Sequence, residues 1–341
     1  MNIIEDTVVD RASWNLFVIE NFPPIGAFLQ SYEWGTFQEK LGRGIQRMAV
    51  QEDGRTVSLF TMVKHKIPIG LSYVYSPRGP VVSNSKRTED VITAIRDWSS
   101  NNLTKSAFLR LEPPVETLEK MEGLIAPKHY LQPRFNHAVR IQDEDEMLMS
   151  FHPSTRSNIR RAPKRGVTVE RKDNITESEL SIFFNMINDT KKRNSGKNAY
   201  PGKMYFESLL TTVPSVGEKP DPTQLTLRTY FGYQNGEPAA MHIVLFFAKT
   251  ATYLFGATMT DKLGSKISTY LHFEGMKDAR KFGMEYYDIG GVDSKRWPSL
   301  SAFKRQFRGV EFEYVGNIDV PIRKSLYYIY ETTRFVRLML N

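Results

Sequence analysis

One lysine stands between two phenylalanines near the end of the chain, and this segment is the strongest candidate for chemistry. In Phe303-Lys304-Arg305-Gln306-Phe307 the aromatic residues are four positions apart, so they share one face of a helical turn and can pack together. Lys304 would then lie beside residues 286–289, an apolar run that predicts a buried strand ended by two glycines. Strand ends in α/β sheets often form ligand sites. A surface lysine on a packed turn is the alternative, which the spacing leaves open.

Most other signatures of catalysis are missing from the sequence. The six histidines are scattered without metal-binding spacing, so we expect no metal site. The chain has no cysteine, which excludes disulfides, thiolate sites and cysteine nucleophiles. It also has no Gly-x-Ser-x-Gly elbow, no P-loop and no dinucleotide fingerprint. These absences point away from metalloenzymes, serine hydrolases and nucleotide-binding folds.

The composition indicates a folded, basic protein. The 341 residues are 40% hydrophobic and carry a net charge of +8, which suits phosphate-bearing partners such as nucleic acid, nucleotide sugars or an anionic membrane face. The N-terminus lacks a basic region followed by an apolar one, and no run approaches the roughly 18 apolar residues of a membrane span. We therefore expect a soluble, cytoplasmic protein.

Positive charge is concentrated between residues 154 and 167. Five cations fall within ten residues: Arg156, Arg160, Arg161, Lys164 and Arg165. The functional interpretation is contact with phosphates or an RNA backbone. A solvated basic helix face is the alternative interpretation.

The chain repeats one order of elements: helix, helix, hairpin, strand, helix, strand. The first copy is predicted at 12–20, 31–41, 47–50 with 56–64, 71–75, 87–100 and 107–111, and the second at 176–188, 203–211, 226–233 with 239–247, 252–257, 267–282 and 286–289. Three landmark pairs lie 182, 180 and 178 residues apart: Gly54 with Gly236, Tyr75 with Phe255, and Arg110 with Asp288. This nearly constant offset predicts a duplicated unit.

The repeated order is mixed α/β and resembles the GCN5-related N-acyltransferase (GNAT) fold. Coenzyme A enzymes of that fold carry Gln/Arg-x-x-Gly-x-Gly/Ala, and the nearest segment here, residues 261–266, has one glycine in register. Coenzyme A binding is therefore disfavoured, although a CoA-dependent N-acyltransferase stays an alternative. A C-terminal helix over 325–340 has an apolar face that predicts docking, with membrane contact as the alternative.

Six segments in order along the chain resemble the FemABX family of nonribosomal peptidyltransferases. They are QSYEWG (30–35), PRGP (77–80), LRLEP (109–113), RSNIRRA (156–162), YDIGG (287–291) and FKRQF (303–307). The resemblance implies two tandem GNAT-like domains with a cleft between them, in a compact form without the helical arm of some relatives. The first domain would comprise residues 1–142 plus 317–341, with the C-terminal helix returning to it, and the second residues 143–316.

The resemblance also implies roles for single residues. Lys304 falls on a lysine that steadies the oxyanion of acyl transfer, with Phe303 before it, and Glu112 falls on an acidic position in the acceptor cleft. Substrate contacts are expected at Tyr205, at Phe255 (in place of a tyrosine), at Arg78 and at Trp34. Thr36 and Pro201 stand where some relatives bind phosphate with a cation, and Lys40 and Lys203 are candidates to replace those cations.

The implied reaction moves an amino acid from aminoacyl-tRNA to the side-chain amine of a peptidoglycan precursor, nucleotide-linked or lipid-linked, in interpeptide-bridge synthesis. The ester is already activated, so neither a cofactor nor a metal is expected. The implied protein is a monomer that can touch the inner membrane face peripherally. A non-catalytic RNA-binding protein that uses the Arg156–Arg165 run is the second alternative.

Overall fold

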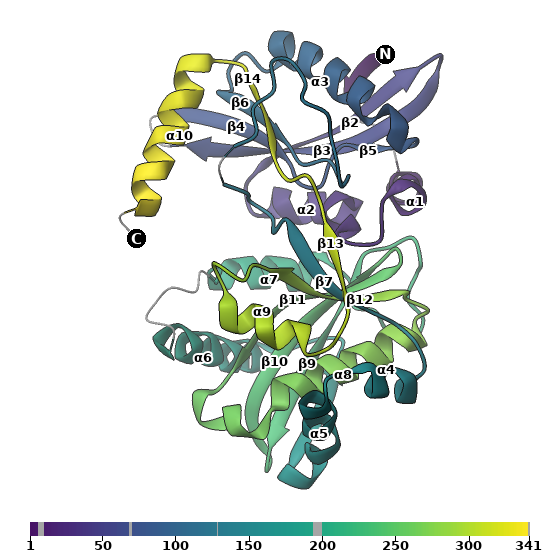
Figure 1. Ribbon diagram of the computed structural model, residues 1–341, viewed down its shortest axis with the longest axis vertical. Helices are drawn as coiled ribbons and strands as arrows, with labels where there is room; N and C mark the ends of the chain where they lie inside the picture. Colours follow the sequence, from purple (N-terminus) through teal and green to yellow (C-terminus); the bar gives the residue numbers. More distant parts are fainter. Residues whose placement is uncertain (6–9, 68–69, 128, 194–199, 340–341) are drawn as a thin grey trace. The chain divides into compact units, whose positions relative to one another are not determined.

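The structure is a computed structural model, and it describes residues 1–5, 10–67, 70–127, 129–193 and 200–339. The chain forms two compact units (Figure 1). The first comprises Met1–Pro23, Leu29–Arg134 and Glu313–Asn341, and the second Pro24–Phe28 and Phe135–Phe312. Within the described residues each unit is built on a seven-stranded mixed sheet, which confirms the mixed α/β class.

The duplicated order of elements is confirmed. The first unit contains β1 (Asn2–Glu5), α1 (Arg11–Asn21), α2 (Tyr32–Lys40), β2 (Gly44–Glu52), β3 (Arg55–Ile67), β4 (Leu71–Ser76), β5 (Val81–Val82), α3 (Thr88–Asn102), β6 (Phe108–Leu111), β14 (Ile318–Pro321) and α10 (Lys324–Met339). The second contains β7 (Phe135–Arg140), α4 (Glu144–Ser150), α5 (Pro153–Arg161), β8 (Val167–Lys172), α6 (Glu177–Arg193), α7 (Lys203–Thr212), β9 (Thr226–Gln234), β10 (Glu237–Phe247), β11 (Thr250–Thr258), η5 (Thr260–Ser265), α8 (Ile267–Lys281), β12 (Tyr286–Val292), α9 (Pro298–Arg305) and β13 (Val310–Glu313). The series α1-α2-β2-β3-β4-α3-β6 thus recurs as α6-α7-β9-β10-β11-α8-β12.

Local chemistry explains why both hairpins form. Asp53 and Gly54 have φ angles of 51° and 74°, and Asn235 and Gly236 have 52° and 81°. A two-residue turn with both φ angles positive matches the twist of the flanking strands, and Asp-Gly and Asn-Gly tolerate it best. The turns therefore specify the β2–β3 and β9–β10 pairings from short stretches of sequence.

In each sheet, the strand next to the parallel pair comes from outside the repeated series. The sheets run β1-β2-β3-β4-β6-β14 and β13-β7-β12-β11-β10-β9-β8, with β5 added on β3. In each, a parallel pair (β4 with β6, β11 with β12) is followed by an antiparallel strand. That strand is β14 against β6 in the first sheet and β7 against β12 in the second.

This exchange of strands sets the division between the units. β7 follows β6 in the chain but pairs in the other sheet, so residues 135–142 lie in the second unit, whereas the sequence predicted them in the first. The second boundary falls at 312/313 rather than 316/317. Pairing with a distant strand leaves no signal in the neighbouring sequence. Both boundaries predicted from the sequence therefore lie a few residues further along the chain than those in the structure.

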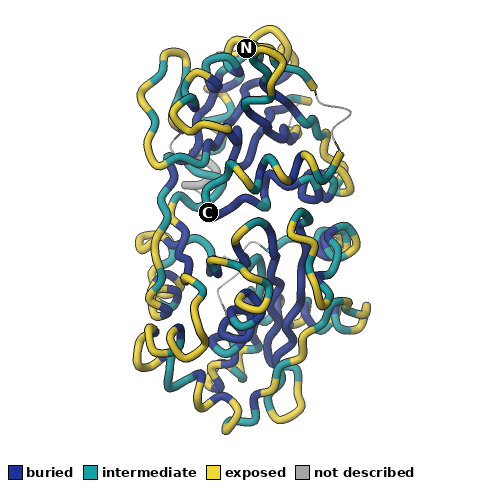
Figure 2. The backbone as a smooth tube through the Cα atoms, turned by 90° about the vertical axis from the view of Figure 1, so that its right-hand side faces the viewer, coloured by how far each residue is buried: buried dark blue, intermediate teal, exposed yellow. Residues whose placement is uncertain are grey.

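Each unit has its own apolar core, and the buried backbone follows the central strands (Figure 2). The first core includes a docking site for α10, where Tyr327 and Tyr330 pack on Phe108 with ring centroids 5.3 and 5.0 Å away. Ile329, an apolar residue of the same helix, is 53% exposed and lies outside this docking face. Within the described ranges, every helix is too short or too polar to cross a lipid bilayer.

Candidate active site

The segment around Lys304 folds as the sequence predicts. Pro298 occupies the start of α9, where its missing N–H is not needed by the helix. Phe303 and Phe307 pack edge-on with ring centroids 5.7 Å apart, and Phe307 is fully buried against Phe151. This packing turns Lys304 inward, and the residue is only 6% exposed.

The glycine pair holds the lysine instead of ending the strand. We predicted that β12 stops before Gly290, but it continues through Gly291 to Val292. Gly290 has a φ of +93°, and a Cβ there would lie 3.3 Å from Lys304 Nζ. Nζ donates a hydrogen bond of 2.7 Å to the carbonyl oxygen of Gly291. Glycine is therefore required where the backbone approaches the ammonium group.

Burial and one carboxylate act on Lys304 in opposite directions. Loss of water lowers the pKa of the Lys304 ammonium from 10.5 to about 8, and the negative charge of Asp288 opposes this shift. The group remains mostly protonated at pH 7, because that pH lies below its pKa. Lys304 is therefore a poorly hydrated cation with a fixed direction, and such donors stabilise developing negative charge well.

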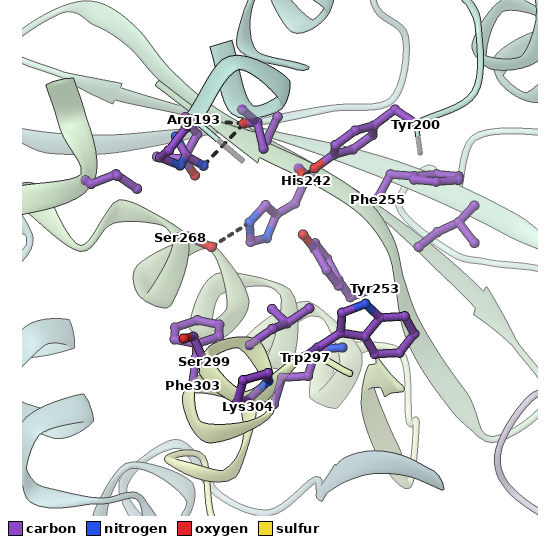
Figure 3. A pocket seen from close by; sticks show the side chains of 18 residues that line it. Arg193, Tyr200, His242, Tyr253, Phe255, Ser268, Trp297, Ser299, Phe303 and Lys304 are labelled. Carbon is purple, nitrogen blue, oxygen red and sulfur yellow. Dashed lines mark hydrogen bonds between the residues drawn. The ribbon is translucent and has the colours of Figure 1, made fainter. Parts of the chain in front are cut away.

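Lys304 borders a pocket of about 610 Å³ in the second unit (Figure 3). Several aromatic rings line it: Tyr200, Tyr253, Phe255, Trp297 and Phe303. Arg193 lies at the other end, where its guanidinium donates to the carbonyl oxygen of Thr258. The pocket thus combines apolar walls with two cations, a composition that fits an anionic ligand carrying a ring or an acyl group.

Two uncharged polar side chains, His242 and Ser268, line the pocket, and a second buried histidine, His272, packs against His242. His242 Nε2 lies 3.1 Å from Ser268 Oγ, and its ring is 4.5 Å from that of His272. Burial lowers the pKa of His242 to about 3 and that of His272 well below its usual range, so both are neutral at pH 7. Sequence reasoning missed this group, because residues 30 positions apart in a strand and a helix show no common spacing.

Glu112 and Lys304 lie in different units. Glu112 directly follows β6 in the first unit, where its carboxylate accepts hydrogen bonds from Tyr75 Oη at 2.6 Å and from the Arg78 backbone N–H at 3.2 Å. It is fully buried. The structure therefore gives this acid a fixed orientation and local partners within its own unit.

The predicted substrate-binding residues are also divided between the units. In the first, Arg78 is buried with its guanidinium over the Tyr314 ring, Trp34 packs on Phe37 in the core, and Lys40 is exposed. In the second, Tyr205 packs edge-on against Phe255, with ring centroids 5.8 Å apart. Lys203 is exposed and pairs with Glu177 and Glu207. Among these residues, Phe255 lines the pocket that contains Lys304.

The basic run forms α5 and the turn after it in the second unit. Arg160, Arg161 and Lys164 are exposed, while Arg156 donates to the Met149 carbonyl oxygen. Arg165 donates to the carbonyl oxygen of Ser265 at 3.2 Å, which attaches the run to η5. Leu263 of η5 and Ser268 of α8 line the pocket, so the same short segment borders both the basic run and the pocket.

Comparison with known proteins identifies the family. The sequence profile of the FemAB family matches residues 11–129, 122–216 and 228–334. A lipid II:glycine glycyltransferase from Staphylococcus epidermidis (strain ATCC 35984) is 23% identical over 91% of this chain and 92% of its own. The crystal structure of FemX superposes with a TM-score of 0.78 at 20% identity, covering 97% of this chain and 100% of the other. A tandem GNAT protein from the clavulanic acid biosynthesis pathway gives 0.55 at 10% identity, covering 94% and 98%. The resemblance noted in the sequence is thereby confirmed, and the chain belongs to the FemAB family.

Proposed function

We propose that this protein is an aminoacyltransferase that moves an amino acid from aminoacyl-tRNA to the side-chain amine of a peptidoglycan precursor. The observation that carries the proposal is the buried ammonium of Lys304, which is held by Gly291 in a pocket of the second unit. Family membership supplies the acceptor, since the similar Staphylococcus epidermidis protein is named for glycyl transfer to lipid II. The transferred amino acid would become the first or a later residue of an interpeptide bridge.

The chemistry needs no further group to activate the donor. The free amine of the precursor attacks the ester carbonyl carbon, a C–N bond forms, and negative charge develops on the carbonyl oxygen. The Lys304 ammonium donates to that oxygen, an interaction typically worth about 3–4 kcal/mol in the transition state. The C–O bond to the ribose then breaks, and the ribose oxygen takes a proton. The amine must lose a proton overall, and Glu112 is our candidate to receive it.

The pocket favours the aminoacyl end of the tRNA as its ligand. Tyr200, Phe255 and Trp297 offer rings on which a base or ribose can stack, and Arg193 offers a cation near one end. The basic run contacts η5 through Arg165, and its exposed cations suit the phosphates of the acceptor stem. The acceptor, nucleotide-linked or lipid-linked, must then bring its amine to Lys304 from outside the pocket.

We place the reaction in the cytoplasm, at the inner membrane face when the acceptor is lipid-linked. The outer side of α10 supports a peripheral contact there, because Tyr328 and Ile329 are 59% and 53% exposed beside the exposed Arg323 and Lys324. Tyrosine and basic side chains on a helix suit an anionic bilayer surface.

The proposal is tested by incubating the protein with a set of charged tRNAs and with nucleotide-linked or lipid-linked pentapeptides, and measuring the masses of the products. We expect the mass of one amino acid to be added to one acceptor class. If neither acceptor class gains mass with any charged tRNA, the proposal is contradicted. Calorimetry with acetyl-CoA is run in parallel, since tight binding would favour the CoA-dependent alternative.

A further inference from the structure

We propose that Asp288 is the positioning residue for Lys304: its buried carboxylate fixes the glycine pair that holds the ammonium group and supplies the negative charge that keeps the group protonated. The inference rests on the proposed function for its catalytic meaning. The charge coupling itself is a property of the protein and can be measured without substrate.

The carboxylate is held from two sides. Asp288 is 1% exposed, and one of its oxygens accepts the backbone N–H of Gly290 at 2.7 Å. The other oxygen accepts the side-chain amide of Asn136, in β7, at 3.0 Å. Because each oxygen has its own donor, the carboxylate cannot rotate without breaking a buried hydrogen bond.

The bond to Gly290 shapes the strand at the point where it meets the lysine. In the pairing with β7, Asp288 lies opposite Ala138 and Gly290 opposite His137, so the register shifts by one residue and Ile289 is left over. Such a bulge bends the strand and changes the direction of the backbone that follows it. Here the next carbonyl, that of Gly291, accepts the hydrogen bond from Lys304 Nζ. Asp288 therefore acts on the lysine through the backbone.

The electrostatic role follows from the groups around Lys304. His272 on α8 and His137 on β7 face it, and burial keeps both neutral at pH 7, because it lowers the pKa of His137 to about 4 and that of His272 well below its usual range. Burial also raises the pKa of Tyr253 on β11, so that phenol is uncharged. On α9 itself, Arg305 is paired with Glu311. The charge of Asp288 is the influence that favours the protonated lysine.

In the first unit, the position of the repeat that corresponds to Asp288 is occupied by an arginine in an ion pair. Arg110, 178 residues before Asp288, sits in β6 and forms a two-bond pair with Asp319 of β14 at 2.6 Å for both bonds. There the two charges offset each other. In the second unit the antiparallel strand β7 offers the neutral Asn136, which orients the carboxylate and brings no positive charge of its own.

The decisive variant is Asp288→Asn, which keeps the size and one acceptor oxygen but removes the charge. Loss of this opposite charge should move the basic limb of the kcat/KM profile down by about one pH unit. The value of kcat/KM should then fall roughly fivefold at pH 8 and change little at pH 6.5. NMR titration of the Lys304 side chain, without substrate, should give the same downward shift of the midpoint. Glu285→Gln, which removes an exposed acid paired with Lys249, should leave the basic limb in place.

Position and charge are separated by Asp288→Glu, which also serves if Asp288→Asn does not fold. It keeps the charge but displaces it, so kcat should fall at all pH values while the midpoint stays near that of the wild type. An unchanged midpoint in Asp288→Asn, with activity lost equally at every pH, would show a merely structural role and overturn the inference. If the wild type transfers no amino acid, the NMR midpoint still decides the inference, so the two failures are distinguishable.

Discussion

The ammonium nitrogen of Lys304 lies 2.7 Å from the carbonyl oxygen of Gly291, and this contact joins the last turn of α9 to the bulged end of β12. It gives a buried cation one direction, which is what a donor to an oxyanion needs before substrate arrives. Four consequences of this arrangement and one of the basic run on α5 can be tested directly.

Replacing Lys304 with methionine should remove most of the activity. Loss of one donor to an oxyanion typically slows acyl transfer about 10²-fold to 10³-fold, so single-turnover transfer should fall by that factor in Lys304→Met. Arg305→Met is the matched control, because the neighbouring cation is exposed and paired with Glu311. Its rate should stay within about threefold of the wild type, as expected for a group that makes no transition-state contact. A transfer rate in Lys304→Met as high as that of the control would contradict the oxyanion role.

The same substitution should stabilise the fold. Burial lowers the pKa of Lys304 from 10.5 to about 8, so its charged form costs the folded state up to about 3 kcal/mol. The cost is fully present below pH 8 and disappears as the pH rises toward 10.5. Urea unfolding at pH 7 should therefore show a higher midpoint for Lys304→Met than for the wild type, and the gap should narrow at pH 10. Equal midpoints at pH 7 would mean that the ammonium is well hydrated.

Transfer should depend on pH through two groups. The attacking amine must be deprotonated, which gives an acidic limb, and Lys304 must stay protonated, which gives a basic limb near pH 8. In Lys304→Arg the guanidinium cannot lose its proton in this range, so the basic limb should vanish even if the rate is lower. A basic limb that persists near pH 8 in Lys304→Arg would assign it to another group.

Alanine at Gly290 should damage both the fold and the site. Its positive φ disfavours a Cβ by roughly 1–2 kcal/mol, and that Cβ would lie 3.3 Å from Lys304 Nζ. Gly54→Ala is the matched control, since Gly54 also has a positive φ but its Cβ would meet open space. Both variants should lose similar stability in urea, yet only Gly290→Ala should lose transfer activity. Similar activities in the two variants would show that the approach of Gly290 to the lysine is unimportant.

Neutralising the exposed cations of the basic run should weaken tRNA binding. In the triple variant Arg160→Gln, Arg161→Gln and Lys164→Gln, affinity should fall, and the slope of log K against log salt should drop by about 0.7–0.9 for each phosphate that the protein no longer neutralises. Lys249→Gln is the control, because that exposed cation is paired with Glu285 and lies outside the basic run. An unchanged slope in the triple variant would assign the run to a solvated helix face.

Features set by neighbouring residues could be predicted from the sequence. The turns at Asp53-Gly54 and Asn235-Gly236 and the pairing of Phe303 with Phe307 each depend on residues a few positions apart. Their geometry follows from local sterics and hydrogen bonding, which act on any chain with those residues. The nearly constant offset between the two copies then extended these local predictions to a duplicated α/β fold.

Features that depend on a distant strand appeared only in the tertiary structure. The bulge at Ile289 needs β7 opposite β12, and the exchange of β7 and β14 joins segments far apart in the chain. The burial that lowers the pKa of Lys304 and neutralises His242 and His272 comes from side chains that share no sequence spacing. The sequence by itself determined which lysine to examine and which elements surround it. The tertiary structure decided that this lysine is buried, charged and fixed, because desolvation and charge coupling depend on distance in space rather than on position in the chain.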